Sequence, residues 1–276
     1  MTFSLGDNSY GKAECRLVRV VRDGPRHEMI DLNVSTSLTG DLADTHLTGD
    51  NAKVLTTDAQ KNTVYAFARE HGISTIEEFG LLLARHFVAT QEPVHGARVG
   101  IERYSWNRLG DHSFARSGGA VRTAAVTLGP AGAEVVGGVR GLTLMNTTGS
   151  EFHGFPRDRY TTLAETTDRI LATDVNAEWL FTGLDADWDA AYTAVTGALT
   201  GAFTGTHSLS LQQTLYAMGG RVIETVPEVA EVRLSLPNKH HFLFDLSPFG
   251  LDNPDEVYYA ADRPYGLIEG TVKREK

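Results

Sequence analysis

The side chains that most often carry metal, phosphate or acyl-transfer chemistry do not have the spacing that such chemistry needs in this chain. The ten histidines include no His-Glu-x-x-His pair, and the single cysteine, Cys15, excludes a Cys-x-x-Cys motif and a disulfide within the chain. His240 and His241 are adjacent, so on a strand they point to opposite faces and cannot readily share one metal. The glycine-rich residues 137–141 lack the pattern of a dinucleotide fingerprint or a P-loop, and no Gly-x-Ser-x-Gly elbow is present.

The composition is that of an ordinary globular protein with an acidic charge balance. Of the 276 residues, 41% are hydrophobic and 22% are charged, and the formal net charge is −10. An acidic surface repels a phosphate backbone, which disfavours nucleic acid as the main partner. No apolar run is long enough to span a membrane, and the N-terminus lacks the pattern of a signal peptide. With one free cysteine and no terminal Ser-Lys-Leu address, we expect a cytoplasmic, bacterial protein.

Hydrophobic periodicity predicts the elements of the first half of the chain. We expect strands over residues 12–21, 29–38, 96–107 and 112–127, a polar loop over 40–51, a helix from 57 or 58 to before 72, and a second helix from 74. Asp23-Gly24-Pro25 predicts a hairpin between the first two strands. Cys15 lies on the apolar face of its strand, which predicts a buried, inert thiol. The order of elements is therefore β-β-α-α-β-β.

The second half repeats this order. We expect strands over residues 132–147, 150–160, 229–237 and 240–247, helices over 186–203 and 209–225, and a short helix within the less regular segment 161–183. The helical pentapeptides at 62–66 and 213–217 also resemble each other. Together these features favour a duplicated α+β unit, with the first copy in residues 1–130 and the second in 131–276.

Seven segments, spread in order over nearly the whole chain, resemble the urate oxidase (uricase) family. They are Tyr10-Gly11-Lys12, Thr57-Asp58-Ala59-Gln60-Lys61-Asn62-Thr63, Phe152-His153-Gly154-Phe155-Pro156-Arg157-Asp158-Arg159-Tyr160-Thr161-Thr162-Leu163, Thr167-Asp168-Arg169-Ile170-Leu171-Ala172-Thr173-Asp174, Ser210-Leu211-Gln212-Gln213-Thr214, Leu236-Pro237-Asn238-Lys239-His240-His241-Phe242 and Asp262-Arg263-Pro264-Tyr265-Gly266. Any one segment is a weak signal, whereas seven in the same order are specific. The resemblance implies two tandem tunnelling-fold units with antiparallel sheets, assembled as a homotetramer into a barrel around a central tunnel.

The resemblance also implies a catalytic proton relay of Lys12, Thr57 and His240. A lysine next to a hydroxyl can accept a proton from urate where its surroundings favour the neutral amine, and the histidine would hold the lysine and a water chain in order. The residues alone leave simpler roles open. Lys12 would be a solvated strand lysine, Thr57 a helix N-cap and His240 an ordinary strand histidine.

A substrate clamp is the second set of residues that the resemblance implies. The fork of Arg169 and the amide of Gln212 can hydrogen-bond the carbonyls and nitrogens along one edge of a purine trione. Phe152 would stack under the urate plane, although a core aromatic is the commoner fate of a phenylalanine. Asp58 and Leu211, where the family commonly has valine, would contact urate through their main chains. Asn238 would lie with Thr57 above the urate plane, at the dioxygen or water site.

These residues predict cofactor-free oxidation of urate by dioxygen and water to 5-hydroxyisourate and hydrogen peroxide in purine catabolism. The active sites would lie at subunit interfaces, with no metal, flavin, nucleic acid or membrane as a partner. Two alternatives remain. One is another tunnelling-fold enzyme that acts on a purine or pterin, which would commonly use zinc. The other is a non-catalytic purine-binding protein that keeps the clamp and lacks the chemistry.

Overall fold

The computed structural model describes residues 2–275, apart from the side chain of Asp262. The chain forms two compact units that interleave in the sequence. The first comprises Met1–Gly138 and Leu180–Asp189, and the second comprises Val139–Trp179 and Ala190–Lys276. No helix within residues 2–275 is long and apolar enough to cross a membrane.

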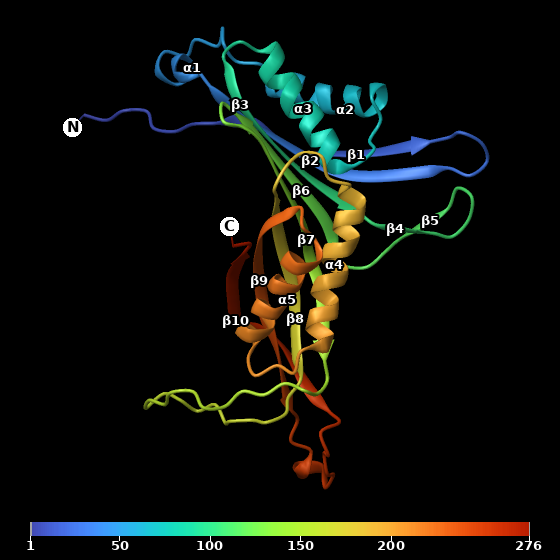
Figure 1. Cartoon of the computed structure of the whole chain (residues 1–276), viewed down its shortest axis with the longest axis vertical. Coiled ribbons are helices and arrows are strands. Elements are labelled where there is room, and N and C mark those ends of the chain that lie inside the picture. Colours follow the sequence, from blue (N-terminus) through green and yellow to red (C-terminus); the bar gives the residue numbers. More distant parts are fainter. Residues whose placement is uncertain (1, 276) are drawn as a thin grey trace. The chain divides into compact units, whose positions relative to one another are not determined.

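The first unit is an antiparallel sheet covered on one face by two helices (Figure 1). Its elements are β1 (Tyr10–Val21), β2 (Glu28–Gly40), α1 (Ala43–Leu47), α2 (Thr57–Glu70), α3 (Ile76–Thr90), β3 (Val94–Tyr104), β4 (Trp106–Arg108), β5 (Phe114–Arg116), β6 (Val121–Gly129) and the start of β7 (Gly132–Asn146). The main strands follow the order β1-β2-β3-β6-β7, and β4 and β5 form a separate hairpin. Helix α2 packs on β1, and α3 packs on β3 and β6.

The core of the first unit follows from the two periodicities of its sequence. Val64 on α2 and Phe87 on α3 have no exposed surface, and neither do Leu38 and Val99 on the facing strands. One apolar stripe on each helix thus covers the apolar side of the sheet. The opposite face of the sheet carries polar side chains at paired positions of neighbouring strands.

The second unit repeats the design with its own pair of helices (Figure 1). Its elements are most of β7, β8 (Leu171–Phe181), α4 (Trp188–Gly205), α5 (Leu211–Thr225), β9 (Val229–Leu243), a short 3₁₀ turn (Ser247–Phe249) and β10 (Tyr258–Lys273). The strand order is β7-β8-β9-β10, and α5 packs on β9 and β10. Each half of the sequence therefore has the predicted β-β-α-α-β-β order, although two strands of the second half, β8 and β10, lie elsewhere than predicted. The division at residue 130 stays a proposal about the duplicated copies.

The hairpin, the main helices and most strands occur where they are predicted, with one correction at a helix start. Thr57 is the first residue of α2, and the N-cap is Thr56, whose side chain accepts a hydrogen bond from Ala59 N at 3.1 Å. Thr75 caps α3 in the same way through Glu78 N. Thr57 therefore keeps its hydroxyl free of the capping role that the sequence offered as its simplest function.

Other elements differ from the predictions. Residues 40–51 contain α1, residues 112–127 are divided into β5 and β6, and residues 150–160 form no strand beyond a single bridge at Phe152. The segment 161–183 contains β8 instead of a helix, β9 continues through Pro237, and β10 was not predicted at all. The result is a long loop, residues 147–170, between β7 and β8, which is the yellow-green loop in Figure 1.

Candidate active site

The nine predicted site residues divide between the two units. Lys12, Thr57 and Asp58 belong to the first unit. The other six belong to the second unit, and they are Phe152, Arg169, Leu211, Gln212, Asn238 and His240.

Lys12 lies on β1 immediately before a β-bulge. The register between β1 and β2 shifts between Lys12 and Cys15, and Glu14 within the bulge has a φ of 57°. Gly11 allows the two strands to approach closely, because a Cβ there would lie 1.8 Å from the Thr36 carbonyl oxygen. Such bulges redirect side chains locally and recur next to active sites. Beyond the bulge Cys15 is buried, as predicted, and burial raises the pKa of its thiol.

Thr57 and Asp58 occupy the first turn of α2. The backbone N–H groups of a first helical turn lack partners within the helix, so they are available to an anionic ligand. The Asp58 carboxylate accepts hydrogen bonds from Lys61 Nζ at 2.5 Å and Asn62 Nδ2 at 2.9 Å. These bonds, the one with Lys61 first, hold the pKa of Asp58 below its usual value, and the charge of Lys12 acts in the same direction. Asp58 thus offers its main chain to a ligand while its side chain is engaged along the helix.

Phe152 and Arg169 come together within the long loop. The Phe152 main chain forms an antiparallel bridge with Thr166, through hydrogen bonds of 2.9 and 3.0 Å. The Arg169 guanidinium then lies over the Phe152 ring, 5.1 Å from its centroid, and its Nε donates to Ser150 Oγ at 3.4 Å. Phe155 stacks on Phe152 at 5.1 Å. The loop therefore places a flat aromatic surface and a planar cation side by side.

Leu211 and Gln212 begin α5 as Thr57 and Asp58 begin α2. Ser210 is the N-cap, accepting from Gln213 N at 3.2 Å, and Gln213 Oε1 accepts from Leu209 N at 2.7 Å. This arrangement approximates a capping box and explains Gln213 as a structural residue. Leu211 is buried, whereas the Gln212 side chain is exposed. The main chain of the first and the amide of the second are therefore available for binding.

Asn238 and His240 lie on β9 opposite an irregularity in β10. Asn238 pairs with Gly266 and His240 with Ala261, so the register shifts between these two pairs. The His240 ring stacks near Phe242 at 5.8 Å. Burial lowers the pKa of His240, and the charges of Arg169 and His241 lower it further. His240 is thus held toward its neutral form and lies within the field of Arg169.

Comparison with known proteins identifies the family. A family model described as Uricase matches residues 8–127 and 135–269. A uricase of Arthrobacter globiformis is 57% identical over 98% of this chain and 90% of its own length, and one of Dictyostelium discoideum is 40% identical over 98% of both.

The chain belongs to the uricase family.

Solved uricase structures support the same assignment. The crystal structure of uricase from Arthrobacter globiformis superposes with a TM-score of 0.97 at 56% identity, covering 100% of this chain and 96% of that one. A urate oxidase of Bacillus sp. TB-90 shares the fold, with a TM-score of 0.84 at 24% identity. These matches confirm the predicted α+β tunnelling-fold class. The chain is accordingly an enzyme of the urate oxidase type, which acts in urate degradation.

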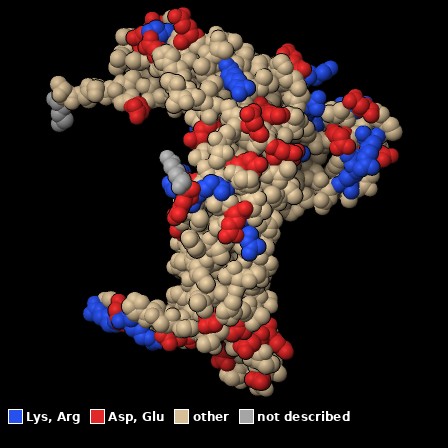
Figure 2. Space-filling view, viewed as in Figure 1, with Lys and Arg blue, Asp and Glu red and all other residues tan. Residues whose placement is uncertain are grey.

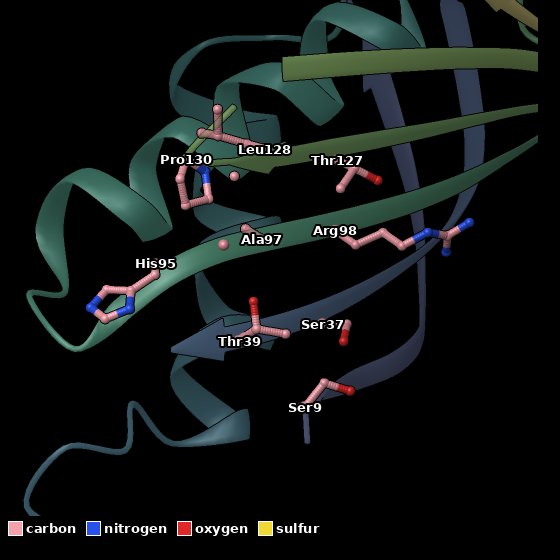
Figure 3. A pocket seen from close by; sticks show the side chains of 11 residues that line it. Ser9, Ser37, Thr39, His95, Ala97, Arg98, Thr127, Leu128 and Pro130 are labelled. Atoms are coloured by element: carbon pink, nitrogen blue, oxygen red, sulfur yellow. The ribbon is translucent and has the colours of Figure 1, made fainter. Parts of the chain in front are cut away.

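The two described cavities do not coincide with the predicted uricase residues. One, of about 400 Å³, lies over the polar side of β2, β3 and β6, where Ser37, Arg98 and Thr127 share a register (Figure 3). The other, of about 420 Å³, is lined by residues 145–149 and 204–207. Among the side chains that the structure describes, no cluster of three or more His, Cys, Asp or Glu residues could hold a metal ion. On the face in Figure 2, basic side chains gather in small clusters at the right-hand edge and at the lower left, and the lower-right end is acidic.

A polar cluster that the sequence does not predict borders the clamp. Glu151 accepts a hydrogen bond from His153 Nε2 at 2.9 Å and one from His207 Nε2 at 2.5 Å. These bonds, the one with His207 first, lower the pKa of the Glu151 carboxyl. The Glu151 amide donates to Ser208 O at 2.7 Å, two residues before the N-cap of α5. No local pattern reveals this cluster, because His207 is 56 residues away from Glu151.

Proposed function

We propose that this urate oxidase converts urate, dioxygen and water to 5-hydroxyisourate and hydrogen peroxide without a metal or an organic cofactor. Urate loses two electrons, dioxygen gains them as peroxide, and water supplies the hydroxyl group added at C5. The observation that carries this proposal is the placement of the Arg169 guanidinium 5.1 Å from the Phe152 ring, with His240 in its electrostatic field. A planar anion fits a site that combines a flat apolar face with a planar cation.

The clamp holds urate by its edge and by one face. Arg169 and Gln212 donate to the carbonyl oxygens and ring nitrogens along one edge, and Phe152 stacks under the ring. The N–H groups in the first turns of α2 and α5 add donors from Asp58 and Leu211, and helix N-termini favour a bound anion. In its family role, Asn238 lies with Thr57 above the ring and holds dioxygen or water.

The relay removes the second proton that makes urate electron-rich enough to reduce dioxygen. Lys12 acts as the base, Thr57 transfers the proton, and His240 orders the water chain. The lowered pKa of His240 supports this role, because a neutral imidazole has both a donor and an acceptor nitrogen. The protein then contributes orientation and proton transfer, while dioxygen itself is the oxidant.

The active site is completed between subunits of a homotetramer in this proposal. Thr57 and Asp58 of one subunit meet Phe152, Arg169 and Gln212 of another, as the family resemblance implies. Neither described cavity is lined by any of these residues, so no cavity within one unit accounts for them. Tetramer formation also covers sheet edges that would otherwise be free to pair.

A double-mutant cycle tests the relay. Lys12→Met and Thr57→Ala should each lower kcat on the order of a hundred- to ten-thousand-fold, with smaller effects on urate affinity, because neither group is assigned to ground-state binding. If the two residues act as one relay, the double mutant should be little worse than the poorer single mutant. A double mutant whose loss equals the product of the single losses would show independent roles, and the relay would have to be abandoned.

A further inference from the structure

The backbone of Lys12 is held by a buried hydroxyl on the neighbouring strand. Thr36 Oγ1 accepts a hydrogen bond from Lys12 N at 3.3 Å and lies 3.5 Å from the Lys12 carbonyl oxygen. The Thr36 residue is only 5% exposed. The bulge interrupts the regular main-chain pairing of β1 with β2 immediately after Lys12. The Thr36 hydroxyl therefore holds the Lys12 backbone at the position where this pairing ends.

The same hydroxyl connects β2 to the helix that carries Thr57. Thr36 Oγ1 donates to Gln60 Oε1 at 2.8 Å, and Gln60 has no exposed surface. Gln60 is three residues after Thr57 on α2, so the two side chains lie on neighbouring positions of one helix. A continuous buried path therefore runs from the backbone of Lys12 through Thr36 and Gln60 to the first turn of α2.

This path is costly for a purely structural feature. Gln60 Nε2 is buried with no hydrogen-bond partner among the described residues, and a buried polar group without a partner destabilises the folded state. The rest of this helix face is apolar, with Val64 and Ala68 buried one and two turns later. An apolar side chain at position 60 would satisfy the packing of α2 on β1 without this cost. A role of Thr36 and Gln60 in positioning nearby groups therefore explains this polar pair better than a contribution to stability does.

We propose that Thr36 and Gln60 are positioning residues that hold the Lys12 backbone and the first turn of α2 in one geometry, so that the Lys12 amine and the Thr57 hydroxyl stay in register for proton transfer. The inference rests on the relay assigned to these two residues above. Neither Thr36 nor Gln60 touches urate in this account. Their effect passes through Lys12 and Thr57, and it concerns the rate of proton transfer and not the binding of substrate.

The first test compares two substitutions at Thr36. Thr36→Val keeps the shape and removes the hydroxyl, whereas Thr36→Ser keeps the hydroxyl. Displacement of reacting groups by about 1 Å can cost on the order of a hundredfold, so we expect Thr36→Val to lower kcat by ~10- to 100-fold with little change in KM for urate. Thr36→Ser should retain most of kcat. Equal losses in both variants, or a change confined to KM, would overturn the inference.

Gln60→Leu gives the same test from the other side of the hydrogen bond, and Thr173→Val is the matched control. Thr173 is a fully buried threonine on β8 whose hydroxyl has no partner among the described residues, so its replacement should leave kcat unchanged. The thermal unfolding temperature of every variant shows whether a loss of activity comes from a loss of the folded structure. If Thr36→Val does not fold, Gln60→Leu decides the outcome, and a folded Gln60→Leu enzyme with full kcat would contradict the proposal.

Combining Thr36→Val with Lys12→Met distinguishes failure of this inference from failure of the relay. If Thr36 acts through Lys12, adding Thr36→Val to Lys12→Met should lower kcat no further. A further loss of the full ~10- to 100-fold would show that Thr36 acts independently of Lys12, and only the positioning inference would fall. Full activity of Lys12→Met alone would overturn both proposals, because positioning would then have no catalytic group to serve.

Discussion

Arg169→Ala is the substitution that probes the clamp most sharply. It removes the guanidinium that lies 5.1 Å from the Phe152 ring centroid, together with its hydrogen bond to Ser150 Oγ. The Arg169 side chain is half-buried, so its charge is partly desolvated, and this burial lowers its pKa. A desolvated cation that meets an anionic ligand forms a stronger contact than an exposed one.

The expected loss follows from these surroundings. Truncating one partner of a buried, hydrogen-bonded charge pair typically costs about 2–5 kcal/mol. Because each 1.4 kcal/mol is a factor of ten, urate affinity should fall by roughly 30- to 4,000-fold. Arg169 is half-buried, so we expect a value toward the lower end of this range. Arg169→Lys should recover part of the affinity, because an ammonium restores the charge but not the two-pronged contact.

Initial rates of urate loss, followed by absorbance over a wide range of urate concentrations, give KM and kcat for each variant. Arg98→Ala is the matched control, because Arg98 is an exposed arginine on the polar side of β3 that belongs to neither the clamp nor the relay. It should leave KM unchanged. An Arg169→Ala enzyme with the KM of the parent would remove Arg169 from the substrate site and contradict the clamp.

Two further predictions concern pH and assembly. Burial and the charge of Arg169 lower the pKa of His240 below the ordinary histidine value of about 6.5, so the neutral form predominates at neutral pH and is lost as the pH falls through the lowered pKa. The fall of kcat at acid pH that depends on His240 should therefore have its midpoint below about pH 6.5. In Arg169→Ala this midpoint should shift to higher pH, because the nearby positive charge is gone. An unchanged midpoint would show that Arg169 does not influence the protonation of His240. Light scattering should give the mass of four 30.0 kDa chains; a fully active monomer would contradict a site shared between subunits.

The sequence predicts the first hairpin correctly and errs at strands β8 and β9. The hairpin of β1 and β2 follows from clear alternation and a Gly-Pro turn. Strand β8 begins with three consecutive buried residues, Leu171, Ala172 and Thr173, which hide the start of the strand, and burial alternates only after Thr173. Strand β9 was divided in two at Pro237, yet the structure keeps this proline within the strand, opposite Leu267.

The candidate site was predicted as a set of residues and not as a geometry. Family resemblance supplied Lys12, Arg169 and His240 with their roles, which stay predictions until they are tested. The contact between Arg169 and Phe152 follows the bridge between Phe152 and Thr166 within the long loop. The sequence wrongly predicts a strand over residues 150–160 of this loop. The Thr36–Gln60 pair joins residues 24 positions apart, so only the folded chain reveals it.

The most direct test of the central claim is a stoichiometric assay of the purified protein under air. After exhaustive treatment with a chelator and dialysis, with no cofactor added, we expect one dioxygen consumed and one hydrogen peroxide formed for each urate lost, at the same rate as before treatment. The time courses of dioxygen consumption, measured with an oxygen electrode, of peroxide formation, measured by titration, and of urate loss, measured by absorbance, should coincide. Activity that disappears with the chelator and returns only with copper, iron or a flavin would contradict cofactor-free oxidation of urate.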